Sequence, residues 1–131
     1  MNKIYICTPY FGDSRDQNKA LQAAQLVCYE GCIPIAPILY FPQILDQHND
    51  GQRLKGLNLG IELLKDCQEL WIVGNEITSD MELVLSIARE MRIPTELFDD
   101  KVSHIDPTTL QIDSRVNNDY RAIVRKLNVI R

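Results

Sequence analysis

The chain has 131 residues, of which 45% are hydrophobic and 24% charged, and its formal net charge is −4 at neutral pH. This length fits one domain with a single core, and the composition excludes an intrinsically disordered protein. Lysine and arginine form no basic cluster on one face before the last dozen residues. A nucleic-acid partner is therefore not expected, because a phosphate backbone requires a basic footprint.

The four cysteines are Cys7, Cys28, Cys32 and Cys67. Cys28 and Cys32 are not spaced as C-x-x-C and have no neighbouring histidine, so no zinc site is expected. We expect buried, reduced thiols instead. The sequence also contains no signal peptide and no apolar run long enough to cross a membrane. These features predict a cytoplasmic protein that holds no metal and contacts no membrane.

The first strand is predicted at residues 3–8 (KIYICT), where an apolar run is stopped by Pro9. Such continuous apolar character is typical of a central parallel strand covered on both faces. A loop follows at residues 9–17, and a helix is predicted from residue 18 to 30, ended by Gly31. The apolar face of this helix comprises Ala20, Leu21, Ala24, Val27 and Cys28.

A second strand is predicted at residues 33–36, and Pro34 places it at an edge of the sheet. Residues 37–52 contain two prolines and end in a polar stretch, which predicts a long loop with one helical turn. A helix follows at residues 53–65. Its apolar face comprises Leu54, Leu57, Ile61 and Leu64.

The third strand is predicted at residues 69–74 (ELWIVG) and the fourth at residues 95–98. Between them, Ser79 caps a helix that runs to about residue 92, and Glu82 completes an S-x-x-E capping box. Strands and helices therefore alternate along the chain. This order predicts an α/β fold with a parallel sheet, right-handed crossovers and helices on both faces.

The sequence changes character at Asp99, so we divide the chain into a domain of residues 1–98 and an arm of residues 99–131. The arm is polar and mixed up to a predicted helix at residues 117–127. We expect the arm to pack on the domain or to reach a partner subunit, and the apolar face of this helix favours a homo-oligomer. That face comprises Tyr120, Ile123, Val124 and Leu127.

Ligands of open parallel α/β sheets bind beyond the carboxyl ends of the strands. The loops at residues 9–17, 37–50 and 74–80 are therefore the candidate binding segments. None of them carries the G-x-G-x-x-G fingerprint or the P-loop pattern, so ordinary dinucleotide and ATP sites are not expected. Neither His48 nor His104 has a Ser, Cys or Asp constellation near it in the sequence, and both are expected to be solvated.

The first of these loops offers Tyr10 and Phe11 beside Gly12, whose backbone a ligand can approach closely. Alternatively, the two aromatic rings plug the top of the sheet. The third loop lies at a helix N-terminus, which suits phosphate or ribose oxygens, although Ser79 can serve as a cap alone. The polar and glycine residues of this loop are Gly74, Asn75, Thr78 and Ser79.

Several motifs resemble the nucleoside 2-deoxyribosyltransferase-like superfamily, especially its short bacterial and phage members. The resemblance spans residues 3–98 and rests on KIYICTPYFGD, Asn18 with its helix, GCIPIAPILYFPQ, GLNLGIELLKDCQELWIVGNEIT and MELVLSIAREMRIP. It implies a flavodoxin-like (Rossmann-like) sheet, homo-oligomers, a nucleoside or nucleotide pocket, and no cofactor. The ligand-binding residues that we expect are Thr8, Pro9, Tyr10, Phe11, Gly12, Asn18, Gly74, Asn75, Thr78, Ser79 and Met81.

In active members of that superfamily a Glu on the helix after the third strand attacks the anomeric carbon of the sugar. It stands four residues before a small residue and three after a Met, and counting from Ala88 or from Met81 leads to Val84. The Asp that orients the sugar would fall near Gly60, and it is also missing. Glu82 stands two residues from Val84, about 200° around an α-helix.

Three hypotheses follow from these departures. The first is a protein that binds or sequesters a nucleoside or nucleotide, such as an ADP-ribose-like signal, without glycosidic chemistry. The second is an N-glycoside hydrolase or nucleoside deoxyribosyltransferase that uses Glu82 as a displaced nucleophile, with Tyr10 assisting, and that requires an irregular helix start. The third is a scaffold or subunit whose pocket is vestigial and whose C-terminal helix makes its contacts.

Overall fold

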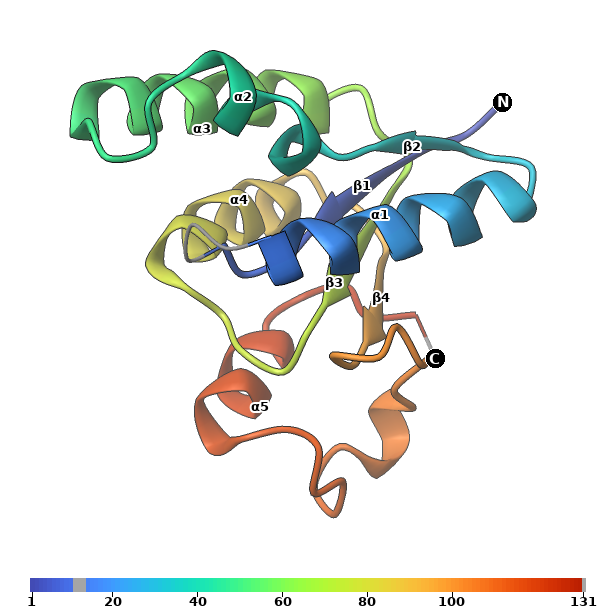
Figure 1. Ribbon diagram of the computed structural model, residues 1–131. Coiled ribbons are helices and arrows are strands. Elements are labelled where there is room, and N and C mark those ends of the chain that lie inside the picture. The colour runs from blue at the N-terminus through green and yellow to red at the C-terminus, as the bar shows by residue number, and fades with distance from the viewer. Residues whose placement is uncertain (11–13, 131) are drawn as a thin grey trace.

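The computed structural model describes residues 1–10 and 14–130 (Figure 1). In chain order its strands and α-helices are β1 (Lys3–Cys7), α1 (Ser14–Tyr29), β2 (Ile33–Ile35), α2 (Phe41–Ile44), α3 (Asp50–Leu64), β3 (Glu69–Val73), α4 (Ser79–Glu90), β4 (Thr95–Phe98) and α5 (Asn118–Val124). Short 3₁₀ turns, η1 (Pro37–Leu39) and η2 (Pro107–Thr109), complete these elements. No helix in the described part of the chain is long and apolar enough to span a membrane.

The four strands form one sheet with the order β2-β1-β3-β4, and every pair is parallel. The alternation of strands and helices predicts such a parallel sheet, and this strand order is the flavodoxin-like one that the superfamily resemblance implies. The two central strands are β1 and β3, and their apolar runs are buried on both faces. Strand β2 lies at an edge, as Pro34 indicates, because proline cannot donate a hydrogen bond to a neighbouring strand.

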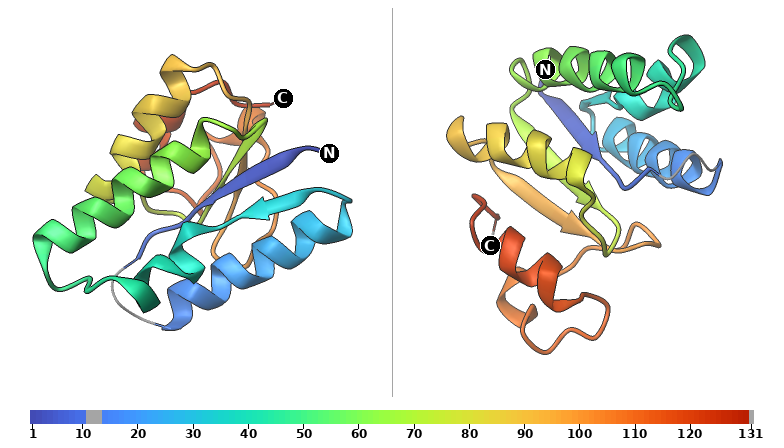
Figure 2. Two further views of the ribbon diagram at one scale, coloured as in Figure 1. Left: turned by 90° about the horizontal axis from the view of Figure 1, so that it is seen from above. Right: turned by 90° about the vertical axis from the view of Figure 1, so that its left-hand side faces the viewer.

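Side chains of the strands alternate between two apolar cores, since successive residues of a strand point to opposite faces. The right-hand view in Figure 2 shows α1 on one side of the sheet and α4 on the other. The face toward α1 carries Ile4, Ile6, Trp71, Val73 and Phe98. The opposite face, toward α3 and α4, carries Tyr5, Cys7, Leu70, Ile72 and Leu97.

Helix α1 begins at Ser14, four residues before the predicted start, and its buried stripe differs from the prediction. Leu21 is 48% exposed and Cys28 is also exposed, so neither belongs to the core. Both lie one position beyond a buried residue, which turns them about 100° away from the sheet. The stripe that contacts the sheet is formed by Ala20, Ala23, Ala24 and Val27.

Helix α3 also begins earlier than predicted, because Asn49 acts as its N-cap. The Oδ1 atom of Asn49 accepts a hydrogen bond from the backbone N–H of Gln52 at 3.1 Å, which satisfies an otherwise unpaired donor of the first turn. Ile61 and Leu64 are buried and Leu57 is partly buried, as predicted. Leu54 is instead 46% exposed.

The cap of α4 corrects the predicted pair of Ser79 and Glu82. Thr78 is the N-cap, and its Oγ1 accepts from the backbone N–H of Met81 at 3.3 Å. The sulfur of Met81 accepts in return from the backbone N–H of Thr78 at 3.4 Å. The helix therefore starts one residue earlier than a Ser79 cap requires, and Met81 takes the third position in place of Glu82.

Residues 99–130 pack against the α4 side of the sheet and along β4. The backbone N–H of Ile105 donates to Leu97 at 2.8 Å, and Thr95 exchanges backbone hydrogen bonds with Asn128 and Ile130, both at 2.8 Å. Tyr120 and Val124 of α5 are 1% exposed and join the core of that face. Ile123 and Leu127 are partly buried and pack against the same core. The chain itself therefore covers much of the apolar face that favoured an oligomer, and the homo-oligomer stays a prediction.

Candidate functional site

A cleft opens where β1 ends, between the η1–α2 segment, the N-terminal half of α3 and the start of α4. This is the carboxyl edge of the sheet, where ligands of parallel α/β folds bind. The cavity volume is about 120 Å³. Sites that enclose a whole drug-sized ligand measure roughly 300–1,000 Å³, so this cleft has room for a compact part of a ligand.

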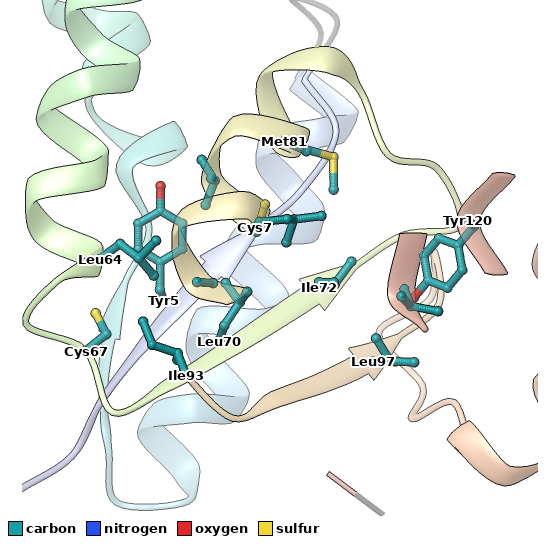
Figure 3. Packing of buried hydrophobic residues seen from close by; sticks show 14 of the residues in the cluster. Tyr5, Cys7, Leu64, Cys67, Leu70, Ile72, Met81, Ile93, Leu97 and Tyr120 are labelled. Carbon is teal, nitrogen blue, oxygen red and sulfur yellow. The ribbon is translucent and has the colours of Figure 1, made fainter. Parts of the chain in front are cut away.

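The floor of the cleft is apolar. Tyr5, Cys7, Met81 and Val84 all line it, and none of the four is more than 5% exposed. Figure 3 shows the Tyr5 ring beside Leu64, with Cys7 and Met81 lying toward the start of α4. Burial raises the pKa of the Cys7 thiol to about 12. The thiol therefore stays protonated near neutral pH and is a poor nucleophile.

Tyr5 contributes a hydroxyl group to this floor. Burial is the main cause that raises the pKa of this phenol well above its usual value, and the neighbouring Cys7 and Cys67 add to the effect. The hydroxyl therefore keeps its proton over the whole accessible pH range. It can donate a hydrogen bond to a ligand but cannot serve as a base at neutral pH.

Arg53 and Asp80 form the charged wall of the cleft. The Nη1 atom of Arg53 lies 2.6 Å from one carboxylate oxygen of Asp80 and 2.7 Å from the other. The hydrogen bond to Asp80, together with its charge, raises the pKa of Arg53 above its usual value. The side chains of Arg53 and Asp80 are 33% and 42% exposed, so both can meet a ligand that enters.

Thr8, which follows β1, lines the cleft and carries a buried hydroxyl. The residue is 8% exposed, and its Oγ1 has no hydrogen-bond partner among the described residues. An unpaired buried hydroxyl is unfavourable by about 1–3 kcal/mol, and such groups in native proteins usually have a partner. A ligand or an ordered water that donates to or accepts from Thr8 would remove this penalty.

Four of the residues expected to bind the ligand are brought together in the cleft, namely Thr8, Tyr10, Thr78 and Met81. Phe11 and Gly12 lie outside the described residues. The other five are described but do not line the cleft, namely Pro9, Asn18, Gly74, Asn75 and Ser79.

Gly74 and Asn75 contact the neighbouring loops of the sheet edge and not the cleft. Gly74 adopts a φ of +113°, which favours glycine, and a side chain there would approach the buried Pro9 to 3.1 Å. The amide of Asn75 donates to Asp100 at 3.3 Å. These contacts join the loop after β3 to the loops after β1 and β4, rather than to the cleft.

Val84 and Glu82 lie on different sides of α4. Val84 is 3% exposed and lines the cleft. Glu82 is exposed and lines a shallow depression formed with the end of the C-terminal arm, beside Arg89 and Lys126. The helix is α-helical from Ser79 onward, so the irregular start that would turn Glu82 into the cleft is not present.

Gly60 lies in the α3 wall of the cleft, near the position where the superfamily resemblance implies an Asp. A Cβ atom at this position would come within 3.2 Å of the Tyr5 hydroxyl oxygen and within 3.5 Å of Pro37. The space that an Asp side chain needs is therefore narrowed by the phenol of Tyr5. Glycine at position 60 thus leaves the space that the Tyr5 hydroxyl occupies.

Sequence reasoning missed Arg53, Asp80 and Tyr5 as cleft residues. The sequence places Arg53 at the start of a predicted helix and Asp80 at the end of the loop at residues 74–80, and their pairing spans 27 residues of sequence. The strand period could have identified Tyr5, because it shares a face with Cys7 at the binding edge.

The described residues contain no group of three His, Cys, Asp or Glu side chains that could hold a metal ion.

A family model described as a domain of unknown function, DUF7768, matches residues 2–98. None of the curated proteins matches the sequence significantly. Among solved structures, the chain is similar to a 2-deoxyribosyltransferase from the psychrotolerant bacterium Bacillus psychrosaccharolyticus, with 17% identity and a TM-score of 0.60 over 92% of this chain and 89% of that chain. This likeness confirms the fold that the sequence resemblance implies.

Proposed function

The chain belongs to the DUF7768 family, and from the cleft that this segment builds we propose that it binds a nucleoside or nucleotide and leaves the glycosidic bond intact. One observation carries this proposal. The cleft occupies the binding edge of a deoxyribosyltransferase-like fold, yet Val84 and Gly60 stand where the resemblance implies the two carboxylates of the reaction.

Binding is supported by what the cleft offers. The buried hydroxyl of Thr8 and the charged pair of Arg53 and Asp80 surround an apolar floor. Apolar walls with a few polar groups are typical of small-molecule sites. Because the enclosed volume is small, we place the sugar in the cleft, with the base or phosphates extending outward. A longer ligand such as an ADP-ribose-like signal fits this arrangement.

The absence of cleavage follows from the groups that reach the cleft. Among the described lining residues Asp80 is the sole carboxylate, and both its oxygens contact Arg53. The positive charge of Arg53 stabilises the Asp80 carboxylate and so lowers its nucleophilicity, although its free lone pairs can still accept hydrogen bonds. The Cys7 thiol is protonated because its pKa is about 12. Glu82, the displaced nucleophile of the enzyme hypothesis, lies outside the cleft.

The proposal is tested by mass spectrometry of the ligand that co-purifies with the protein. Gently purified protein is heat-denatured, the released molecules are identified, and the same pool is incubated with intact protein. A panel of ribonucleosides, deoxyribonucleosides, their 5′-monophosphates and ADP-ribose is incubated in parallel. We expect a nucleoside-type molecule in near-stoichiometric amount, and no free base or sugar phosphate accumulating with time.

Two variants separate the alternatives. If free base accumulates, Glu82→Ala and Asp80→Asn identify the carboxylate responsible, and turnover lost in the Glu82 variant alone would establish the enzyme hypothesis. If the protein retains no nucleoside-type molecule and binds none of the panel, the binding proposal is wrong. The scaffold hypothesis then becomes the better account.

A further inference from the structure

We propose that Asp80 recognises the vicinal hydroxyls of a ribose, so that the cleft selects ribonucleosides and ribonucleotides over their 2′-deoxy counterparts. This inference rests on the proposed function and specifies its ligand class. It makes Asp80 the residue that determines sugar specificity and Arg53 the residue that positions it.

Asp80 is held in one orientation. Nη1 of Arg53 approaches its two oxygens at 2.6 and 2.7 Å, so the carboxylate is held facing Arg53 on α3. A carboxylate has about four lone-pair positions, and these two contacts leave acceptor capacity on both oxygens. The Asp80 side chain is 42% exposed and lines the cleft. Its remaining acceptors are therefore open to a ligand.

The partner of such an acceptor pair must supply hydrogen-bond donors. Two adjacent hydroxyl groups provide them in the manner by which acidic residues of dinucleotide-binding folds hold a ribose diol. A phosphate group supplies none when ionised and is repelled by the carboxylate. The single positive charge of Arg53 is already shared by Asp80 and by Asp50, whose oxygen lies 4.0 Å from Nη2. The wall thus has no excess positive charge for a phosphate.

Thr8 gives the second observation. Thr8 lines the same cleft and is more than nine-tenths buried, and its Oγ1 has no partner among the described residues. A threonine hydroxyl can both donate and accept, which suits the mixed donors and acceptors of a sugar. The cleft volume of about 120 Å³ also favours a sugar over a purine base as the enclosed part.

The experiment measures dissociation constants by calorimetry for the four ribonucleosides, their 2′-deoxy and 3′-deoxy counterparts, and the corresponding 5′-monophosphates. We expect the unmodified protein to bind the best ribonucleoside or ribonucleotide roughly 10- to 100-fold more tightly than either deoxy form, the range for one lost hydrogen bond to a charged acceptor. Comparing natural and deoxy ligands needs no variant, so misfolding cannot obscure the result.

Asp80→Asn replaces one acceptor by a donor at nearly constant shape. It should weaken binding of the ribose form to about the level of the deoxy forms, which should themselves change little. Asp50→Asn is the matched control, because Asp50 also approaches Arg53 but its side chain is 93% exposed and does not line the cleft. It should leave the preference for ribose unchanged.

Three outcomes would overturn the inference. Equal binding of ribose and deoxyribose forms leaves the proposed function standing and removes the role of Asp80. A preference for guanine regardless of sugar would assign the carboxylate to a base edge instead. If no member of the panel binds, the proposed function and the inference fail together.

Discussion

Arg53 in the first turn of α3 and Asp80 in the first turn of α4 are joined by contacts of 2.6 and 2.7 Å at the cleft. This ion pair links two helices that meet the sheet independently. Because both side chains are about one-third or more exposed, the pair should contribute little to global stability. Its effect should be local, at the N-terminal end of α3.

Arg53→Met should therefore speed amide hydrogen exchange in the first two turns of α3 while the midpoint of thermal unfolding changes little. Lys65→Met is the matched control. It removes the exposed pair of Lys65 with Glu62, which is 2.8 Å apart near the other end of the same helix. Exchange that stays unchanged in the Arg53 variant would show that the pair does not hold α3 to α4.

Alanine variants of Thr78 and Ser79 can show which of the two residues caps α4. Thr78→Ala removes the side-chain acceptor for the Met81 N–H and should lower the free energy of unfolding by about 1 kcal/mol. Ser79→Ala should stay within about 0.5 kcal/mol of the parent, as exposed substitutions usually do. Urea denaturation of the two variants provides the measurement. The reverse order would reinstate a cap at Ser79.

The effect of Gly60→Ala on the free energy of unfolding should depend on the residue at position 5 and should change sign when Tyr5 is replaced by Phe. In a helix, alanine is favoured over glycine by about 0.5–1 kcal/mol, but here its Cβ meets the Tyr5 hydroxyl oxygen at 3.2 Å. Tyr5 is 5% exposed and cannot easily move. We expect Gly60→Ala to destabilise the parent and to stabilise a Tyr5→Phe background. A double-mutant cycle in urea measures this coupling, and additive effects would contradict the steric account.

Glu96 should make the protein less stable as the pH rises. Partial burial, and then repulsion by Glu69 and Glu30, raises its pKa to about 7. Between the ordinary Glu pKa of about 4.3 and pH 7, the folded state binds more protons than the unfolded state. The free energy of unfolding therefore falls with pH across this window. In the Glu96→Gln variant the free energy of unfolding should fall less steeply as the pH rises.

The measurement for Glu96 is urea denaturation at several pH values from 4 to 8 in both proteins. The variant should exceed the parent in stability at pH 8, where the parent carries the unfavourable charge. The two should converge near pH 4, where Glu96 is protonated in both states. Parallel curves would show that Glu96 does not titrate differently on folding.

Tyr120→Phe should stabilise the protein by about 1 kcal/mol. The ring is 1% exposed, and its hydroxyl is buried without a partner among the described residues. Removing an unsatisfied hydroxyl abolishes its desolvation penalty while keeping the ring contacts. Tyr29→Phe is the control, because Tyr29 is 89% exposed and its hydroxyl stays in water. A destabilised Tyr120 variant would reveal a water-mediated partner.

The sheet could be predicted well from the sequence, because its signals are local. The runs around Ile6 and Trp71 are apolar without interruption, which marks central strands, and Pro34 marks an edge. The superfamily resemblance led to the same fold, which the structural comparison supports. Local composition and strand period were enough for this level of description.

The charged wall of Arg53 and Asp80 could not be predicted, because it forms only where α3 and α4 meet in space. The two residues are 27 positions apart, and no local pattern in the sequence indicates that they pair. Arg53 and Asp80 are each ordinary surface residues until α3 and α4 are placed side by side. The cap was mistaken for a related reason. Thr78 and Ser79 are both good caps, and the helix start that chooses between them is set by the packing of Met81 into the core.

The pairing along β4 limits how copies of this chain can associate. Its outer edge is occupied by residues 104–105 and 128–130, so among the described strands the open edge belongs to β2. There the N–H of Ile33 donates toward Asn2, which turns the nitrogen of Pro34 outward, and that nitrogen carries no hydrogen. Edge-to-edge pairing between the sheets of two molecules is therefore disfavoured at both β4 and β2. Assembly of this protein is therefore expected to use surfaces other than the two edges of its sheet.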